Sequence, residues 1–243
     1  MIDIHTHILP DVDDGPQTVE EAIEIARQAS EEGVKVIVAT PHIIEVPSER
    51  EWLKITETFH CLREILNLQK IDIDIILGAE LFVSLSFPKA IKQNKALTIN
   101  GRNKYVLLEF PMQEIPSFTE QCMYEFLIQG IVPIIAHPER CLEIQENNSR
   151  VHDLVKRGAL TQMNAGSLLG RYGKKAKKTA QDLLAKNLIH IIGSDTHSVS
   201  NGSYILSQGV KMASKVIGKA RANELIRLIP EKIIRGELVK TYH

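Results

Sequence analysis

The chain has 243 residues, of which 44% are hydrophobic, and this is enough to bury the core of one barrel-sized domain. Its formal net charge is -1, so no overall basic field attracts nucleic acid or an anionic membrane surface. No basic-then-apolar leader and no apolar run of about eighteen residues is present, so we expect a cytoplasmic protein that does not insert into membranes.

Short apolar runs of the β type recur along the chain and alternate with longer amphipathic stretches. Several runs are continuously apolar, as in Val34-Lys-Val-Ile-Val-Ala and Ile131-Val-Pro-Ile-Ile-Ala, which is typical of parallel strands covered on both faces. Seven strands are predicted, at Ile2–His5, Val34–Thr40, Ile73–Leu77, Tyr105–Glu109, Val132–Ala136, Leu160–Asn164 and Ile189–Gly193.

The amphipathic stretches predict helices between these strands. They cover Val19–Glu32, Ser48–Leu68, Phe87–Gln93, Thr119–Gln129, Asn147–Arg157, Lys174–Lys186, Tyr204–Ile217 and Lys219–Leu228. Gly33, Gly130, Gly158 and Asn187 fall between a helix and a strand, where a residue that tolerates the left-handed conformation ends a helix. Strands that alternate with helices close naturally into an α/β barrel, so we expect one (β/α)7 domain over residues 1–243.

The first strand ends in two histidines, His5 and His7, and the carboxylates of Asp13 and Asp14 follow. Residues two apart on an extended segment project to the same side, so two imidazoles can bind one ion. Imidazole and carboxylate ligands together suit divalent Zn, Mn or Fe. By itself the pattern is equally compatible with two ordinary histidines near a strand end.

Six of the seven predicted strands end in or run into a His, Asp or Glu. Chemistry in such barrels lies at the carboxyl ends of the strands, so these side chains should share one rim. Any one of them could be a hydrogen-bonded or solvated residue, but acidic residues are rarely buried unless paired or bound to metal. The candidate ligands are His5, His7, Asp14, His42, Glu80, Glu109, His137, Asp195 and His197.

Nine candidates exceed the three or four protein ligands that one ion requires, so the inventory suits two or three ions. Such a cluster fits phosphate-ester hydrolysis, because the ions share the phosphoryl charge and lower the pKa of bound water to roughly 7. The nucleophile would then be metal-activated hydroxide. The three cysteines, Cys61, Cys122 and Cys141, lie outside any phosphate-cradling loop, which removes the usual thiolate mechanism and fits a reducing compartment.

Motifs along the whole chain resemble the polymerase and histidinol phosphatase (PHP) superfamily. More narrowly, the chain is similar to the bacterial manganese-dependent protein-tyrosine phosphatases of capsule and exopolysaccharide operons, the CpsB/CapC/YwqE group. The motifs that carry the resemblance are His5-Thr-His7, Asp13-Asp14-Gly15, Thr40-Pro41-His42, Gly78-Ala79-Glu80, Leu107-Leu108-Glu109-Phe110, Ala136-His137-Pro138-Glu139-Arg140 and Gly193-Ser194-Asp195-Thr196-His197.

The resemblance implies a distorted (β/α)7 barrel with two or three divalent ions, Mn²⁺ first and Fe or Zn as alternatives. The implied substrate is phosphotyrosine on a cognate bacterial tyrosine kinase, usually on its Tyr-rich C-terminal tail. The implied ligands are His5, His7, Glu80 and Asp195 for the first ion, Glu80, Glu109 and His137 for the second, and Asp14, His42 and His197 for the third.

Two further residues are candidates for catalytic roles, Arg140 by the same resemblance and Asp13 by its place beside the predicted ligands. Arg140 matches the phosphate-contacting arginine, and a guanidinium beside the ions can engage phosphate oxygens bidentately, although it could instead pair with a nearby carboxylate. Asp13 is a candidate to protonate the tyrosyl leaving oxygen, a role that His42 or His197 could also fill. The sequence leaves open whether Asp13 or Asp14 is the ligand.

The chain departs from its relatives after His42, where Ile43-Ile44 replaces a second histidine that they often carry. Because of this departure, metal affinity or substrate handling could differ from those of the relatives. The short apolar loop beside it could also change the shape of the substrate groove. His60, His152, His190 and His243 lie away from the predicted rim and receive no chemistry.

One charge cluster stands out: the basic run Arg171-Tyr-Gly-Lys174-Lys175-Ala-Lys177-Lys178, which opens a predicted helix. It is either a solvated helix face or a surface that attracts an acidic or phosphorylated partner toward the mouth of the site.

The sequence is compatible with three other functions. The first is hydrolysis of a small phosphate ester such as histidinol phosphate, or of nucleic-acid ends, although no basic aromatic groove favours nucleic acid. The second is an amidohydrolase, which also begins with HxH but commonly needs a lysine that bridges the metals, and no lysine ends a predicted strand. The third is a metal-binding regulator without activity. The sequence does not decide the native metal, the partner kinase or the oligomeric state.

Overall fold

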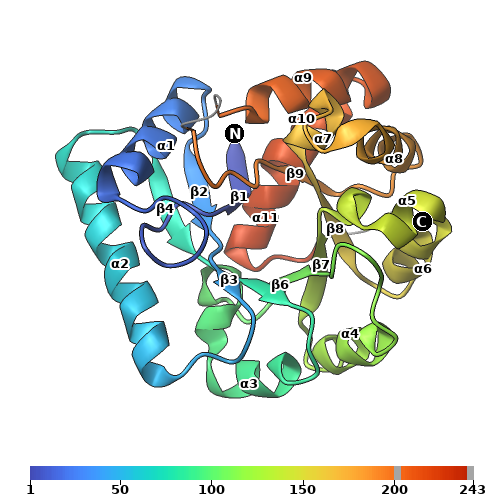
Figure 1. The fold of residues 1–243 in the computed structure, drawn as a ribbon, viewed down its shortest axis with the longest axis horizontal. Coiled ribbons are helices and arrows are strands. Elements are labelled where there is room, and N and C mark those ends of the chain that lie inside the picture. The colour runs from blue at the N-terminus through green and yellow to red at the C-terminus, as the bar shows by residue number, and fades with distance from the viewer. Residues whose placement is uncertain (200–203, 240–243) are drawn as a thin grey trace.

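The computed structural model describes residues 1–199 and 204–239. At its centre lies a ring of parallel strands, and helices cover the outside of that ring (Figure 1). The strands are β1 (Ile2–Thr6), β2 (Val36–Ala39), β3 (His42–Ile43), β4 (Asp74–Leu77), β5 (Glu80–Phe82), β6 (Tyr105–Glu109), β7 (Val132–Ala136), β8 (Leu160–Asn164) and β9 (Ile191–Gly193).

The predicted second and third strands correspond to β2 and β4, and each is followed after a break by a short strand that was not predicted, β3 and β5. One sheet has the order β1-β2-β4 and the other has the order β3-β5-β6-β7-β8-β9, with every pair parallel. The first break falls at Pro41, which has no N–H to donate to the ladder. Across the breaks, Gly78 N donates to Ala39 O at 2.9 Å and Glu80 N donates to Pro41 O at 3.0 Å. The seven predicted strands therefore run side by side without a gap.

The ring closes where β9 meets β1. Asp195 N donates to His5 O, and His7 N donates to Thr196 O, each at 2.9 Å. Thr6 and Thr196 form a parallel bridge at the same place. The predicted (β/α)7 barrel is confirmed, and its closure is also the place where the first and last groups of site residues meet.

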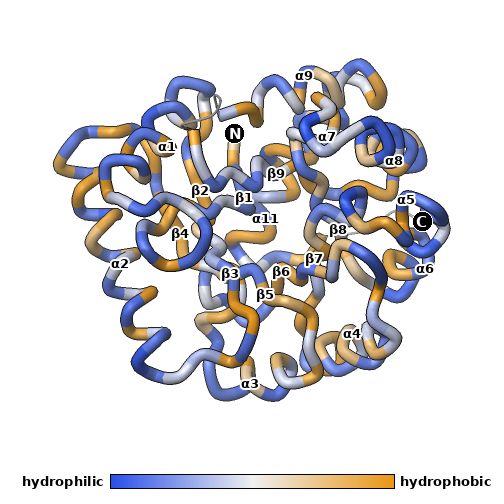
Figure 2. Tube along the Cα trace, in the orientation of Figure 1, coloured by the Kyte–Doolittle hydropathy of each residue, from blue (hydrophilic) through white to orange (hydrophobic). Residues whose placement is uncertain are grey.

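Helices connect the strands and bury one face each, as their amphipathic patterns predict. Figure 2 shows hydrophobic and hydrophilic residues alternating along α2. The helices are α1 (Val19–Glu31), α2 (Glu49–Leu68), α3 (Phe87–Gln93), α4 (Thr119–Leu127), α5 (Leu142–Glu146), α6 (Ser149–Lys156), α7 (Ala165–Leu169), α8 (Gly173–Ala185), α9 (Leu206–Ile217), α10 (Lys219–Asn223) and α11 (Ile229–Arg235). None in the described ranges combines the length and apolar character that a membrane crossing needs.

Helix ends follow the local chemistry of the sequence. Ser48 caps α2 in a capping box with Glu51, because the Ser48 side chain accepts from Glu51 N and the Glu51 carboxylate accepts from Ser48 N. Gly158 and Asn187 have positive φ angles of 106° and 57°, as expected of residues that end helices ahead of β8 and β9.

Helical structure continues beyond Leu228, where the last predicted helix ends. A π-helical turn at Glu224–Leu228 leads into α11, which was not predicted. Pro230 lies in the first turn of α11, where a missing N–H has no cost. Ile233 of α11 packs with Ile4 and Tyr105 in the apolar core inside the ring. The interior is therefore a packed core, and chemistry is confined to the rim.

Candidate metal centre

The structure brings all nine predicted ligands together at the end of the ring where the strands finish. They come from β1 and the loop that follows it (His5, His7, Asp14), from β3 (His42), β5 (Glu80) and β6 (Glu109), and from the loops after β7 (His137) and β9 (Asp195, His197).

His5, His7, Glu80 and Asp195 form a buried group at the centre of this rim. His5 Nε2 lies 3.0 Å from Glu80 Oε2 and 3.3 Å from Asp195 Oδ1. His7 Nε2 lies 3.1 Å and 3.4 Å from the same two oxygens. Their ligand atoms all lie within 4.8 Å of one another, which is close enough to share one divalent ion.

Glu80 is the residue around which the other groups gather. Both of its carboxylate oxygens are buried, and among the described residues neither accepts a hydrogen bond. Oε2 lies 3.2 Å from His42 Nδ1, and Oε1 lies 3.2 Å from His137 Nε2. A buried carboxylate without donors is costly unless a cation compensates it, so Glu80 fits a ligand that bridges ions.

A second group forms on the other side of Glu80. His137 Nε2 lies 3.5 Å from Glu109 Oε1, and His42 Nδ1 lies 3.6 Å from Glu109 Oε2. The predicted trio of Glu80, Glu109 and His137 is thus assembled, and His42 adds a nitrogen that the prediction had assigned to the third ion.

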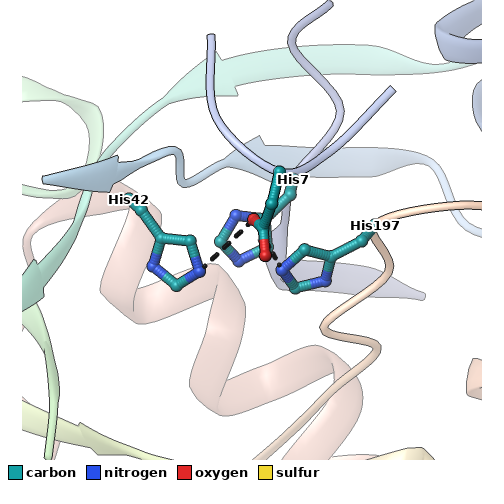
Figure 3. Close-up of side chains that lie close together, drawn as sticks. His7, His42 and His197 are labelled. Atoms are coloured by element: carbon teal, nitrogen blue, oxygen red, sulfur yellow. Dashed lines mark ion pairs between the residues drawn. The ribbon is translucent and has the colours of Figure 1, made fainter. Parts of the chain in front are cut away.

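The third group lies nearer to solvent. Asp14 Oδ1 is 3.2 Å from His197 Nε2 and 3.6 Å from His42 Nε2. Figure 3 shows His42 and His197 on either side of His7, whose ring stacks on that of His197 with centroids 3.9 Å apart. The Asp14 side chain is 67% exposed, whereas that of Glu80 is fully buried, so the rim has a buried half and an open half.

Hydrogen bonds to the outer ring nitrogens aim three of the imidazoles inward. His5 Nδ1 donates to Gln162 Oε1 at 2.9 Å, and His197 Nδ1 donates to the backbone carbonyl of Asp195 at 3.1 Å. His7 Nδ1 donates to Asp13 Oδ2 at 2.8 Å. Because these acceptors require a proton on Nδ1, Nε2 is the nitrogen of each ring that can give up its proton and bind an ion, as in a metal-binding histidine.

Asp13 and Asp14 have different positions, although they are adjacent. Besides His7, Asp13 accepts from the backbone N–H groups of His42 and Gly15, each at 3.0 Å. Burial opposes ionisation of Asp13, but its bonds to His7 and to these N–H groups lower its pKa. Asp13 therefore orients His7 and the backbone at His42 and Gly15, and its role as an acid stays a prediction. Asp14 is the one placed as a ligand.

Protons and metal ions compete for this site. Burial disfavours a charged His5, but the Glu80 and Asp195 carboxylates outweigh it and raise the pKa of His5 to about 9. Burial and the neighbouring Glu80 carboxylate raise the pKa of Glu109 to about 7. Metal ions bind the deprotonated forms, so binding at neutral pH has to displace protons.

Two site residues have unusual backbone conformations. His137 has a φ of 27° and Asp195 a φ of 53°, in a region that side chains other than glycine enter rarely. His137 directly follows β7, and Asp195 comes two residues after the last residue of β9. Such conformations persist where the surrounding structure over-determines them, typically at functional sites.

Arg140 lies at the edge of the buried group. Its Nη1 donates to Asp195 Oδ2 at 2.9 Å, and its guanidinium carbon lies 4.4 Å from the centroid of the Tyr172 ring. The alternative that Arg140 pairs with a nearby carboxylate is therefore what the structure shows, with Asp195 as the partner. Glu139 is not the partner, because it is buried and accepts from Asn164 N and Ser167 Oγ. The side chain of Arg140 is 25% exposed, so it faces both Asp195 and the mouth.

Sequence reasoning missed several polar residues that hold this arrangement. The sixth predicted strand, β8, carries no His, Asp or Glu, but its amides Gln162 and Asn164 contact His5 and Asp195. Buried Asp3 accepts from Ser194 N at 3.0 Å and from the hydroxyl of Tyr204. Alternation along β1 places Asp3 on the same side as His5 and His7, and this was the signal available in the sequence.

The histidines predicted to have no role in the chemistry, and the cysteines, lie away from the site where the structure describes them. His60 and His152 lie on helices, and His190 contacts Thr161 beneath the rim. His243 lies outside the described residues. Cys122 and Cys141 are buried, and burial raises the pKa of the Cys122 thiol to about 11, which is the opposite of an activated nucleophile.

Comparison with known proteins agrees with this site. The family model for capsular polysaccharide synthesis, CpsB/CapC, matches residues 1–235. The chain belongs to the CpsB/CapC family. It is 36% identical to the tyrosine-protein phosphatase YwqE of Bacillus subtilis, over 90% of this chain and 85% of that protein. It is 34% identical to the tyrosine-protein phosphatase CpsB of Streptococcus pneumoniae, over 98% of this chain and all of that protein.

A solved structure of the CpsB/CapC family has the same fold. It comes from crystal structures of YwqE from Bacillus subtilis and CpsB from Streptococcus pneumoniae, described as metal-dependent tyrosine phosphatases. The TM-score is 0.92 at 33% identity, over 99% of this chain and 96% of that one. Tyrosine phosphatases of this family that depend on metal therefore have the barrel seen here.

The departure after His42 leaves an apolar surface beside the site. Ile43 is buried in β3, and Ile44 is 69% exposed. With Val46 and Pro47 they line a groove of about 600 Å³ that also borders His42. A substrate bound at the open half of the rim would therefore meet aliphatic side chains beside His42.

Proposed function

We propose that this chain is a metal-dependent protein-tyrosine phosphatase that hydrolyses phosphotyrosine on a bacterial tyrosine kinase of a capsule or exopolysaccharide system. The observation that carries the proposal is the convergence of four imidazoles on the buried Glu80 carboxylate and of a fifth, His197, on Asp14. The outer nitrogens of His5, His7 and His197 are held by hydrogen bonds. Membership of the CpsB/CapC family and the named activity of the relatives support the choice of substrate.

The groups of the rim correspond to three ion positions. His5, His7, Glu80 and Asp195 would hold one ion; Glu80, Glu109 and His137 a second; Asp14, His42 and His197 a third. Mn²⁺ is the proposed metal, with Fe and Zn as ions that the same ligands accept. Bound divalent ions would supply Lewis acidity, neutralise phosphoryl charge and activate water near neutral pH.

The chain's own residues bind and orient the phosphoester. Arg140 is placed to donate to phosphate oxygens while Asp195 and Tyr172 fix its guanidinium, which adds stabilisation as negative charge develops. Asp13 holds His7 in the tautomer that the site requires. Phenolate is a fair leaving group, so the reaction proceeds without a dedicated acid at Asp13.

We also propose that residues 1–243 form one domain and that the protein works in the cytoplasm, where its kinase substrate presents phosphotyrosine. Supporting this, the three cysteines are free thiols in the structure, as a reducing compartment allows.

The experiment is a comparison of substrates and metals. Purified protein is stripped with EDTA, reloaded with Mn, Fe or Zn, and assayed on a phosphotyrosyl peptide and on histidinol phosphate. We expect chelation to abolish activity, metal to restore it, and the peptide to be preferred. Activity that persists in chelator would contradict the metal mechanism, and preference for histidinol phosphate would assign the site to a small ester.

A further inference from the structure

The basic run at the start of α8 is not used by the proposed chemistry. Arg171, Lys174, Lys175, Lys177 and Lys178 lie within eight residues of a chain whose net charge is only -1. Lys174, Lys175 and Lys178 are exposed. We call these five residues the basic rim.

The basic rim lies on the mouth side of the barrel. Helices run antiparallel to the strands they follow, so the first turn of α8 is at the level of the strand ends that carry the site. A direct contact confirms this position, because Tyr172, one residue after Arg171, lies against the guanidinium of Arg140. Gly166 makes room for this aromatic ring, since a Cβ there would lie 3.1 Å from Tyr172 Cε2.

Helix stability does not account for these charges. The amino end of a helix carries partial positive charge, so lysines in the first turn are unfavourable there, and α8 has no acidic residue in that turn and no side-chain cap. Within the described ranges, none of the four lysines pairs with a carboxylate. Four lysines and Arg171 face the two carboxylates of Glu146 and Asp182, so the surface beside the site carries an excess of positive charge.

The shape and chemistry of this surface fit a peptide. Lys175 and Lys178 line a depression of about 410 Å³ together with the amides of Asn147 and Asn148. Glu146 and Asp182 are the acidic side chains of the same depression. A concave surface with amides and ammonium groups suits an extended acidic chain better than a flat lipid surface.

We propose that the basic rim docks an acidic segment of the phosphoprotein substrate and so directs the adjacent phosphotyrosine to Arg140 and the metal centre. The inference rests on the proposed function, because it assumes a protein substrate. It adds a second contact outside the site, which a small aryl phosphate is too short to reach.

Charge reversal tests the proposal. The variant Lys174→Glu/Lys175→Glu/Lys178→Glu is compared with Lys211→Glu/Lys215→Glu/Lys219→Glu, which makes the same charge change on exposed positions of α9 and α10. Acidic residues stabilise a helix amino end, so the α8 variant should fold. Substrates are para-nitrophenyl phosphate and two phosphotyrosyl peptides of equal length, one flanked by Asp and Glu and one by Asn and Gln.

We expect the α8 variant to lose roughly tenfold in kcat/KM on the acidic peptide, mainly through KM, with little change on the other two substrates. The wild-type preference for the acidic peptide should also fall with salt, because the Debye length shrinks to about 8 Å at physiological ionic strength. Equal loss on all substrates, no loss, or the same loss in the α9/α10 variant would overturn the proposal.

A binding measurement separates this proposal from the proposed function. Fluorescence anisotropy of the labelled acidic peptide reports docking even if no phosphotyrosine is cleaved. Vesicles containing phosphatidylserine provide a second arm. If the α8 variant loses vesicle binding but keeps peptide binding, the surface belongs to a membrane contact and the docking proposal is wrong.

Discussion

The buried and open halves of the metal centre use the same residue types in different surroundings. In the buried half, the side chains of His5, His7 and Glu80 are inaccessible to solvent, and both histidines are oriented by other side chains. In the open half, Asp14 and His42 are 67% and 25% exposed, and water can replace lost contacts. The buried half is therefore pre-organised and intolerant of change, whereas the open half is adaptable and should bind its ion more weakly.

The largest effect is expected from breaking the buried half. His5→Ala should remove metal and abolish turnover, because it deletes a ligand and leaves buried carboxylates uncompensated. Asp14→Ala should lose only part of the bound metal and keep measurable activity. Metal analysis and the phosphotyrosyl peptide assay check both, with His60→Ala as the matched control on the outer face of α2. Equal loss in the two variants would remove the distinction between the halves.

The next effect concerns Arg140, which contacts the buried half without being a ligand. Arg140→Ala should keep its metal but raise the barrier by about 3 kcal/mol, roughly a hundredfold in kcat, as removal of a charge-stabilising donor does. Arg157→Ala, which removes an exposed ion pair with Glu120, is the control. Unchanged kinetics would exclude Arg140 from the mechanism.

A smaller effect should come from the residues that aim the imidazoles. Gln162→Leu removes the acceptor of His5 Nδ1, and Asp13→Asn weakens that of His7 Nδ1. Each should weaken metal binding by roughly 10–100-fold while activity at saturating metal largely recovers. Gln121→Leu on the exposed side of α4 is the control. Affinity equal to that of the wild type would mean that these hydrogen bonds do not set the tautomers.

The smallest effect is the dependence on pH. The pKa of His5, about 9, lies above its ordinary value of 6.5, so its ion pairs stabilise the chelated protein fully below pH 6.5 and are lost as pH rises toward 9. Metal binding displaces that proton, so metal affinity should rise over the same range. Thermal unfolding should therefore show the gap between loaded and chelated protein widening with pH. A constant gap would contradict proton competition at the buried half.

Much of the site could be predicted because its ligands lie at strand ends. The apolar strands can be recognised in the sequence, and so can the His, Asp or Glu at each strand end. Examples are Glu109, the last residue of β6, and His137, which follows β7. Three strands, β6, β7 and β8, have the predicted bounds. The barrel topology then brings these distant residues to one rim.

What could not be predicted depends on contacts between distant segments. The short strands β3 and β5 are recognisable only from the pairing of β3 with β5 and of β5 with β6. Gln162 and Asn164 acquire their roles only when β8 lies beside the strands that carry His5 and Asp195. The assignment of Asp13 and Asp14 needed three-dimensional geometry, because adjacent carboxylates look alike in a sequence.

The closure of β1 against β9 sets when the protein can acquire its metal. During synthesis His5 and His7 emerge from the ribosome early, but Asp195 joins them only once the last strand has been made and has paired with the first. Until then the two imidazoles lack one of the two carboxylates that both of them contact. An ion that needs all four of these ligands would therefore be bound only after β9 has paired with β1.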